Sequence, residues 1–440
     1  MDFIESASLL DGPLYRGDPD GSPDGQMYAA NRERQGLTMQ YSKEEIRQYV
    51  AEEDIKFIRL AFCDLSGRQK NISIHPDELD RALQYGIAFD ASAIPGFGDE
   101  VHSDLFLQPD TSTLCLLPWR PDHGRVARMF CGIVRPDGTP FEADARQLLR
   151  QAVREAEDMG ITFAFGTEME FYLFQRDELG EPTKQPYDHA GYMDIAPEDK
   201  GENVRREICL TLEQMGIRPE CSHHEQGPGQ NEIDFRYSQP LTAADNAVTF
   251  RTVVDSVAVR SGLAADFSPK PISGQPGNGM HINISAKSAD GADVMPRIIA
   301  GILAHIREMT VFLNTVDASY LRFGGSKAPR YISWSSENRS QLIRIPAAQG
   351  EYRRAELRSP DPLCNPYLAF ALLIYAGLDG IRRALPLPAA ADINFFTASQ
   401  QVKERFETLP ATLPQARALA AGSPFLAELL PPAVLEYYTK

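Results

Sequence analysis

The stretch Gly166-Thr-Glu-Met-Glu-Phe-Tyr-Leu-Phe174 places two carboxylates in an otherwise apolar and aromatic segment, which is typical of a β-strand. Side chains two residues apart on a strand point to the same face, so Glu168 and Glu170 should project together. Burying two like charges is unfavourable unless something neutralises them. A divalent cation such as Mg²⁺, which prefers oxygen ligands, would do so. The alternative is an edge strand with one solvated face.

A second acidic cluster lies in His223-His-Glu-Gln-Gly-Pro-Gly-Gln-Asn-Glu-Ile-Asp-Phe235. Glu225 and Glu232 flank a Gly-Pro-Gly turn, which predicts a hairpin or loop that brings the two acids back together. His223 and His224 are candidate metal ligands. The alternative, histidines that are only hydrogen-bonded beside a loop, is equally compatible with the sequence.

A third segment reads Gly277-Asn-Gly-Met-His-Ile-Asn-Ile-Ser285. Its glycines permit close approach of the backbone to a ligand. His281, Asn283 and Ser285 alternate, so they should share one face of a strand. A single histidine is weak evidence for a metal, and this one gains weight only beside the acidic clusters.

Arginines gather in a fourth region, where Arg354, Glu356 and Arg358 follow one another at every second position. A simple ladder of salt bridges is one interpretation. Arg339 and Arg344 precede this segment and favour another, because the guanidinium fork suits phosphates and carboxylates. Acids for a metal and arginines for oxyanions are the components of a phosphoryl-transfer site.

Composition limits the class of protein. The chain has 440 residues, 44 basic and 61 acidic, with a net charge of −17, so general binding to nucleic acid or to an anionic membrane is not expected. The longest near-apolar run, Tyr367 to Leu378, is much shorter than the ~20 residues that span a bilayer. The N-terminus lacks a signal-like pattern, and the six cysteines form no CxxC pair. We therefore expect a cytoplasmic protein with reduced thiols.

The remaining chain reads as mixed α and β structure without a regular βαβ rhythm, a Rossmann glycine motif or a P-loop. Residues 1–38 are turn-rich and polar, which indicates a loosely held arm. Ser42, with Glu45 three residues later, predicts a capped helix start, and two short strands and a helix ending at Gly86 should follow. Three further helices are predicted at 203–216, 243–262 and 297–313.

Taken in order, the four charged segments resemble the glutamine synthetase family, specifically its bacterial type I enzymes. The resemblance extends from residue 42 to near the C-terminus. It implies an α+β chain: a β-grasp domain at 39–133, and a catalytic domain at 134–440 with an antiparallel sheet and helices. It also implies a homo-oligomer, a dodecamer of two hexameric rings, with each active site between neighbouring subunits.

The resemblance also assigns roles to single residues. The ligands of one divalent ion would be Glu170, Glu225 and Glu232, and those of a second Glu168, His281 and Glu356. The arginines on the transferring phosphate would be Arg339 and Arg344, and the other contacts with ATP would be Arg354, Ser285 and Glu220. The acid substrate would be held by Gly277, Arg322 and Arg358. Asp64 would reach into the neighbouring subunit's site and help to hold ammonium.

The implied reaction uses ATP and two or more Mg²⁺ or Mn²⁺ ions. ATP phosphorylates a carboxylate, and an amine then displaces phosphate from the acyl phosphate. Metals and arginines offset the charge on the transferring group. Small-molecule substrates are therefore expected, with glutamate and ammonia as the default pair.

The sequence differs from the family pattern in several places. Lys327, in Gly324-Gly-Ser-Lys-Ala-Pro-Arg330, stands where the family has a catalytic flap glutamate, and a cation there would repel ammonium. Lys327 could act as a base of lowered pKa, or it could bind an anionic group on a different amine together with Arg330. A third reading is that the flap swings away and another acid serves. Gln275-Pro-Gly replaces the usual Asn-Gly near the glutamate substrate.

Three hypotheses about function follow from these comparisons. The first is a ligase for glutamate and ammonia, and the second is the same chemistry with another amine or acid. The third is a non-catalytic ring protein that has kept the fold, which retention of all six metal-ligand positions argues against. Asn283 replaces a second histidine near ATP, but its amide can still donate a hydrogen bond.

Overall fold

The computed structural model describes residues 41–98, 101–120, 123–325, 328–348, 350 and 353–440. Residues 41–440 form one compact unit. The predicted arm at 1–38 lies outside the described residues, as does Lys327.

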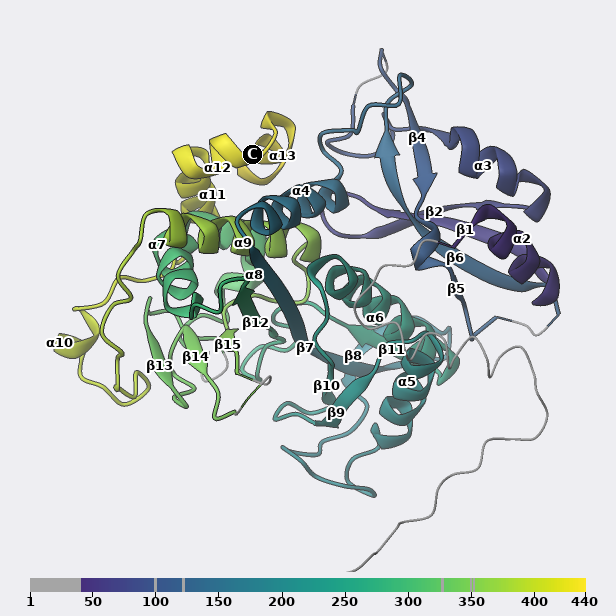
Figure 1. Ribbon diagram of the computed structural model, residues 1–440. Coiled ribbons are helices and arrows are strands. Elements are labelled where there is room, and N and C mark those ends of the chain that lie inside the picture. Colours follow the sequence, from purple (N-terminus) through teal and green to yellow (C-terminus); the bar gives the residue numbers. More distant parts are fainter. Residues whose placement is uncertain (1–40, 99–100, 121–122, 326–327, 349, 351–352) are drawn as a thin grey trace, which may run out of the picture. The chain divides into compact units, whose positions relative to one another are not determined.

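The N-terminal part of this unit is built on a six-stranded sheet (Figure 1). Its strands are β1 (Ile55–Cys63), β2 (Gln69–Ile74), β3 (Ile87–Asp90), β4 (Asp104–Pro109), β5 (Cys115–Leu116) and β6 (Arg125–Val134). The order is β2-β1-β6-β4-β3, with β5 beside β6, and β1 runs antiparallel to β2 but parallel to β6. The first and last strands thus lie side by side in the middle of the sheet. This is the predicted β-grasp arrangement.

Two helices accompany this sheet, α2 (Lys43–Glu52) and α3 (Leu79–Tyr85). The capping box predicted for α2 is present, since Glu45 N donates to Ser42 Oγ at 3.2 Å and Ser42 N donates to Glu45 Oε2 at 2.7 Å. Gly86 follows α3 with φ +74°, a conformation that favours glycine. The local sequence signals therefore placed both helices correctly.

The larger part of the unit is built on a nine-stranded sheet. Its strands are β7 (Ile161–Arg176), β8 (Pro182–Pro186), β9 (Pro219–His224), β10 (Gln230–Phe235), β11 (Leu263–Asp266), β12 (Met280–Ser288), β13 (Trp334–Ser336), β14 (Ile343–Ile345) and β15 (Ala355–Leu357). The order is β13-β14-β15-β12-β7-β10-β9, and β8 and β11 also pair with β7. All pairs are antiparallel except β13–β14. The long strand β7 is thus the centre of the sheet.

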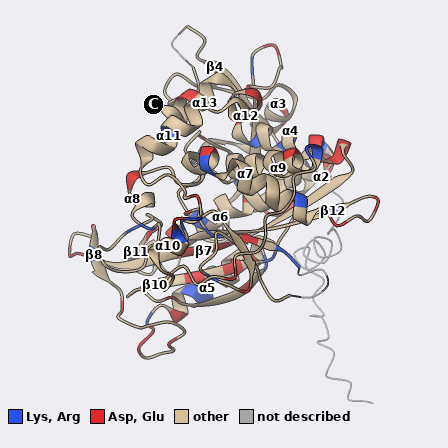
Figure 2. Cartoon of the chain, turned by 90° about the vertical axis from the view of Figure 1, so that its left-hand side faces the viewer, with Lys and Arg blue, Asp and Glu red and all other residues tan. Residues whose placement is uncertain are grey.

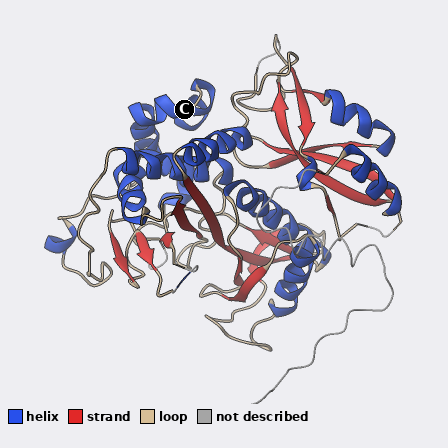
Figure 3. Cartoon of the chain, in the orientation of Figure 1, coloured by secondary structure: helices blue, strands red, loops and turns tan. Residues whose placement is uncertain are grey.

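Helices cover this sheet, as Figure 3 shows in blue. Helices α4 (Ala145–Asp158), α5 (Glu202–Gln214) and α6 (Pro240–Arg260) contact its strands, and α7 (Met295–Leu313) and α9 (Pro366–Arg382) are the other long helices. The short α8 (Asp317–Tyr320) lies between α7 and α9 in the chain, and the short α10 (Gln400–Lys403) follows α9. Near the C-terminus, α11 (Leu413–Ala421) and α13 (Pro432–Thr439) pack against α7, and α12 (Pro424–Leu429) lies between them in sequence. Helix α9 packs against both α4 and α7, and its apolar run is buried in the core. Within the described residues, no helix has the length and apolar character to cross a membrane.

A buried arginine links the two parts of the unit. Arg146 on α4 donates to both carboxylate oxygens of Asp245 on α6, at 3.0 and 2.8 Å, and to Asp110 after β4 at 2.9 Å. The hydroxyl of Tyr367 on α9 also donates to Asp245, at 2.7 Å. A bidentate pair of this kind fixes orientation as well as distance, so it sets how the helices lie against the β-grasp sheet.

Candidate active site

The register of the central strands brings the predicted acids together. Across β7 and β12, Glu168 lies opposite His281. Across β7 and β10, Glu168 lies opposite Asp234, and Glu170 lies opposite Glu232. Residues that are distant in sequence are therefore neighbours because three antiparallel strands align them.

The first cluster consists of Glu168, His281 and Glu356, whose ligand atoms all lie within 4.8 Å of one another. Nδ1 of His281 is 3.2 Å from Oε2 of Glu168 and 3.5 Å from Oε1 of Glu356. Burial would raise the pKa of Glu168, but His281 and the amide of Asn283 outweigh this and lower it to about 2. Two oxygens and one imidazole nitrogen form a donor set that suits Mg²⁺ or Mn²⁺.

The second cluster groups His223 with Glu225 and Glu232 at the predicted hairpin of β9 and β10. Nε2 of His223 is 3.3 Å from Glu225 and 3.8 Å from Glu232. Burial, reinforced by the charge of Glu170, raises the pKa of Glu232 well above its usual value. Such a carboxyl is stabilised in its charged form by a nearby cation.

Glu170, implied as a ligand of this second ion, lies beside these residues. Its Oε2 accepts hydrogen bonds from Gly279 N at 2.8 Å and from Gln230 Nε2 at 3.1 Å. His223 is not in the ligand set that the family resemblance implies. Because it lies beside Glu225 and Glu232, it is an additional candidate ligand of this ion. The assignment of Glu170 stays a prediction.

Asp234 connects the two clusters, because its carboxylate lies with those of Glu168 and Glu232 within 4.8 Å. Burial and the charge of Glu168 raise the pKa of Asp234 to about 7. Cys221 Sγ lies 2.7 Å from its Oδ2. Asp234 is not among the site residues predicted from the sequence, although it lies two residues from Glu232, the same spacing that indicated the Glu168–Glu170 pair.

His224 is hydrogen-bonded inside the protein, which agrees with one of its two predicted alternatives, and it also lies in a buried group with Asp188 and Asp199 whose ligand atoms could hold a metal ion. It is fully buried, with Nε2 2.9 Å from Asp188 and Nδ1 2.7 Å from the carbonyl oxygen of Glu225. Asp188 also accepts from the backbone N–H groups of Lys200 and Gly229. Both ring nitrogens are thus occupied, and the histidine fixes the turn that carries Glu225.

The predicted arginine cluster adjoins the first acidic cluster. Arg344 on β14 contacts Glu356 at 2.5 Å, and Arg358 contacts the other oxygen of the same carboxylate. Nε of Arg354 donates to Asn283 Oδ1 at 2.9 Å, and the amide of Asn283 donates to Glu168 Oε1 at 2.9 Å. Figure 2 shows acidic stretches along β7 with basic stretches of neighbouring loops beside them. Arginines that could bind oxyanions therefore lie next to the carboxylates that could bind a metal ion.

Arg322 and His281 face a space left by Gly279. A Cβ on Gly279 would lie 3.1 Å from Nη2 of Arg322 and 3.1 Å from Nε2 of His281. Among the described residues, both of these buried nitrogens lack a hydrogen-bond partner, as does Nε of Arg322. Buried polar atoms without partners are unfavourable, so this arrangement fits a ligand that would complete their bonding: an anionic group for the Arg322 nitrogens, and a donor or an ion for Nε2 of His281. Gly277 also leaves no room for a larger side chain, since a Cβ added there would lie 2.3 Å from Pro269 O.

The sequence departure at Pro276 has a defined environment. The hydroxyl of Tyr172 donates to the carbonyl oxygen of Pro276 at 2.7 Å, and Nζ of Lys270 donates to that of Gln275 at 2.5 Å. The loop that precedes Gly277 is therefore fixed through backbone carbonyls.

Four further predicted site residues have defined places in the fold. Glu220 is exposed on β9, Arg339 is exposed in the loop before β14, and Ser285 is partly buried on β12. Asp64 lies in the turn between β1 and β2, where its Oδ1 accepts from Ser66 Oγ at 2.6 Å and from Arg68 N at 2.9 Å. The roles of these four residues stay predictions.

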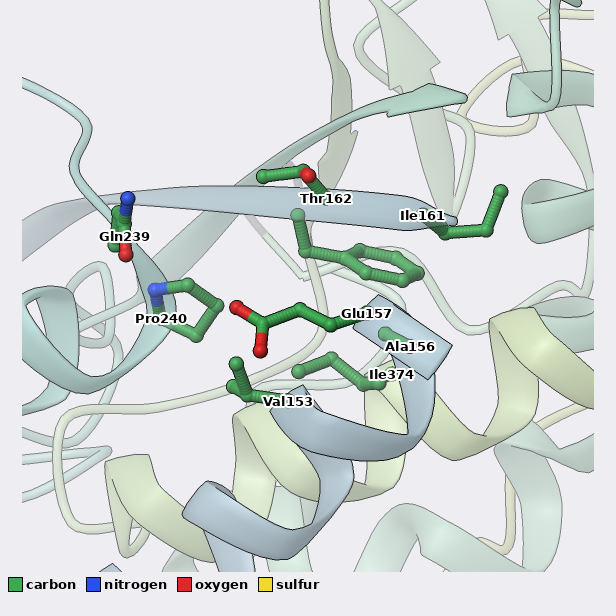
Figure 4. Close-up of a pocket in the computed structure, with 9 residues that line it drawn as sticks. Val153, Ala156, Glu157, Ile161, Thr162, Gln239, Pro240 and Ile374 are labelled. Atoms are coloured by element: carbon green, nitrogen blue, oxygen red, sulfur yellow. The ribbon is translucent and has the colours of Figure 1, made fainter. Parts of the chain in front are cut away.

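A separate pocket lies at the start of β7, between α4, α6 and α9 (Figure 4). It is lined mostly by apolar side chains, among them Val153, Ile161 and Ile374, together with Glu157. Its volume is about 10 Å³, room for roughly one water molecule. This pocket is too small for a nucleotide or an amino acid.

A β-grasp domain joined to a sheet that carries paired acidic clusters and arginines defines an ATP-dependent acid–amine ligase. Residues 54–136 match the glutamine synthetase beta-Grasp domain, and residues 142–440 match the glutamine synthetase catalytic domain. The chain belongs to the glutamine synthetase family.

Individual relatives are similar over most of their length. A glutamine synthetase of Clostridium saccharobutylicum is 46% identical over 391 residues, which cover 86% of this chain and 88% of that protein. A glutamine synthetase of Methanosarcina mazei is 45% identical over 413 residues, which cover 90% of this chain and 92% of that protein. Among solved structures, GmaS in complex with ADP aligns with a TM-score of 0.81 at 27% identity, covering 91% of this chain and 94% of that one. GmaS without ligand aligns with a TM-score of 0.80 at 28% identity, and the alignment covers 89% of this chain and 93% of that one.

Proposed function

We propose that this protein joins a carboxylate to an amine at the expense of ATP through an acyl phosphate, with glutamate and ammonia as the default pair. The observation that carries the proposal is the convergence of carboxylates, His281 and arginines around nitrogens beside Gly279 that have no hydrogen-bond partner within the described part of the chain. The names of the curated relatives support this choice of substrates.

Divalent ions fit the donor set of both clusters. When bound, Mg²⁺ or Mn²⁺ supplies positive charge that offsets the charge of the transferring phosphoryl group. The proposed ligands are Glu168, His281 and Glu356 for one ion, and Glu170, Glu225 and Glu232 for the other. Asp234, which lies with Glu168 and Glu232, offers a further carboxylate oxygen between the two clusters.

The arginines hold the phosphates of ATP and the acid. Arg344 is anchored by Glu356 and is directed toward the first metal cluster, which favours a role on the transferring phosphate together with Arg339. The remaining contacts with ATP are assigned to Arg354, Ser285 and Glu220. Arg322, Arg358 and Gly277 would hold the acid, because the buried nitrogens of Arg322 suit a carboxylate.

The amine side involves Asp64 and Lys327. In the proposed dodecamer of two hexameric rings, Asp64 of one subunit completes the site of its neighbour, where it holds the ammonium. The domain boundaries proposed for each subunit are 39–133 and 134–440. Excluding water from the assembled site would protect the acyl phosphate from hydrolysis.

An assay of ADP release over a panel of acids and amines, with Mg²⁺ present, tests this function. We expect ADP release that requires both glutamate and ammonium, with glutamine as product by mass spectrometry. Glu356→Gln is the negative control, and it should remove activity. ADP release with no pair in the panel would favour the non-catalytic alternative and overturn the proposal.

A second candidate keeps the chemistry but uses another amine. Lys327, in place of the family's flap glutamate, favours it, because a cation opposes the collection of ammonium. If glutamate and ammonium turned over as fast as any other pair, this second candidate would be wrong.

A further inference from the structure

The turn that carries Asp64, residues 64–68 (the Asp64 loop), is held by buried side chains from the catalytic part of the same chain. Nδ2 of Asn365 donates to the carbonyl oxygens of Leu65 at 3.1 Å and Asp64 at 3.3 Å. The hydroxyl of Tyr438 on α13 donates to Leu65 O at 2.5 Å. Asn365 and Leu65 are fully buried. The backbone of the Asp64 loop is therefore determined by residues about 300 or more positions away in sequence.

Packing leaves the Asp64 loop little freedom to move independently. Gly67 has φ +76°, and a Cβ there would lie 2.8 Å from the Cα of Asn365. Asn365 is itself fixed as the N-cap of α9, since its Oδ1 accepts from Tyr367 N at 3.1 Å. A displacement of Asn365 would therefore be transmitted to the loop, because close-packed elements shift together.

Asn365 ends a short segment, residues 359–365 (the connecting segment), whose other end contacts the proposed acid site. Nη1 of Arg322 donates to Ser359 O at 3.1 Å and lies 3.9 Å from Asp361 Oδ2. Asp361 is fully buried and also accepts from Asn314 Nδ2 at 2.9 Å. The guanidinium proposed to bind the acid is thus bonded directly to the start of this segment.

Arg251 on α6 clamps the connecting segment to the loop. Its Nη1 donates to Pro362 O at 3.0 Å and its Nη2 donates to Gly67 O at 2.8 Å. One planar guanidinium therefore holds a carbonyl of each element at a fixed separation. Together with Asn365, it makes a continuous path of contacts from Arg322 to Asp64.

We propose that Arg251 and Asn365 are positioning residues that couple the acid side of one active site, at Arg322, to the Asp64 loop. The coupling rests on the proposed roles of Arg322 and Asp64. When an acid occupies the nitrogens of Arg322, the altered bonding to Ser359 and Asp361 shifts the connecting segment, which adjusts the loop. Because Asp64 is proposed to serve the neighbouring subunit, binding of acid in one site would prepare the amine side of the next.

The test uses the full-length assembly and the variant Arg251→Met, which removes both clamp bonds. Arg260→Met is the matched control, because Arg260 lies at the end of the same helix and is exposed. Arg251→Lys keeps the charge but lacks the planar guanidinium fork that fits both carbonyls, so it should restore part of the function. We expect Arg251→Met to raise the KM for ammonium at least about fivefold while the KM for ATP stays within about twofold.

A second readout follows backbone hydrogen exchange of residues 64–68. Adding L-glutamate with Mg²⁺ and a non-hydrolysable ATP analogue should slow exchange in the unaltered protein and in Arg260→Met, but not in Arg251→Met. Tyr438→Phe, which removes one hydroxyl near the same loop, serves if Arg251→Met does not fold, and it should reduce the effect of the ligands in the same way.

Several results would overturn the coupling. One is equal KM values for ammonium in Arg251→Met and Arg260→Met, and another is a parallel rise of the KM for ATP. A third is exchange at 64–68 that does not respond to the ligands in the unaltered protein. If no acid and amine pair releases ADP, the proposed function fails, while the exchange experiment still decides whether the acid side and the loop are coupled.

Discussion

Nδ1 of His281 lies 3.2 Å from Oε2 of Glu168, directly across the antiparallel pair of β12 and β7. The two residues are 113 positions apart, and only the register of these strands brings them together. A slip of one residue in that register would turn the imidazole to the opposite face of the sheet. The metal site proposed for these residues therefore depends on the packing that fixes the central strands.

Glu356→Gln should abolish activity by weakening the first metal cluster. The substitution keeps the size of the side chain but removes the charge that faces His281 and two arginines. We expect turnover to fall about 100-fold or more, and Mn²⁺ affinity to fall with it. Glu428→Gln, an exposed position on α12, is the control. Unchanged Mn²⁺ binding by calorimetry would remove Glu356 from the ligand set.

Gly279→Ala should block the space between Arg322 and His281. The new methyl group would lie 3.1 Å from a nitrogen of each residue, closer than ordinary contacts. We expect the KM for the acid to rise about tenfold or more, with a smaller change in melting temperature. Gly422→Ala is the matched control, because its Cβ would meet only backbone oxygens at 3.5 and 4.0 Å. An unchanged KM for the acid would place its binding elsewhere.

Lys327→Glu should raise ammonium-dependent turnover if electrostatic repulsion limits it. The change replaces a cation by an anion at the position of the family's flap glutamate, although residue 327 itself lies outside the described residues. We expect the KM for ammonium to fall several-fold at low ionic strength, with less effect at high salt. Steady-state kinetics at the two salt concentrations measure this. If neither KM nor kcat for ammonium changes, repulsion by Lys327 does not limit the reaction.

Local patterns were sufficient to predict much of this protein. The capping box at Ser42 and Glu45 depends on four consecutive residues, and the pairing of Glu168 with Glu170 depends on strand periodicity. The hairpin at the Gly-Pro-Gly turn followed in the same way. These predictions succeeded because the interactions that decide them are close in sequence.

Long-range contacts account for what the sequence did not reveal. The sequence left open which of two adjacent histidines lies beside the acids: His223 is grouped with Glu225 and Glu232, whereas His224 contacts Asp188, 36 residues earlier in the chain. The attachment of the Asp64 loop to Asn365 connects positions about 300 residues apart, which no local pattern encodes. Such pairs require the tertiary structure.

Arg146→Met should strongly destabilise the folded chain. Arg146 makes a buried bidentate pair with Asp245. Its removal leaves the buried carboxylate without these two donors, while the hydroxyl of Tyr367 still donates to it. We expect a loss of about 3–5 kcal/mol in the free energy of unfolding. Arg154→Met, at an exposed position on the same helix, should change it by less than about 0.5 kcal/mol. Urea titration of both variants measures the difference, and equal midpoints would contradict the prediction.

His305 should make the attachment of the C-terminal helices dependent on pH. Its Nδ1 lies 2.5 Å from Glu308 on α7, and its Nε2 lies 2.8 Å from Asp379 on α9. Asp379 also forms a salt bridge with Arg383. Its ring stacks on Phe425 of α12 with centroids 3.7 Å apart. Burial alone would lower the pKa of His305, but the two carboxylates outweigh it and raise the pKa above its usual value.

A histidine whose pKa is raised on folding stabilises the protein fully below its unfolded pKa of about 6.5, and this stabilisation is lost as the pH rises through the folded value. His305→Gln should therefore lower the free energy of unfolding by about 1 kcal/mol or more at roughly pH 6, and by less at roughly pH 9. His189→Gln, at an exposed position, should have little effect at either pH. Urea denaturation at both pH values tests this. A loss that is equal at the two values would show that His305 acts through packing on Phe425 rather than through its charge.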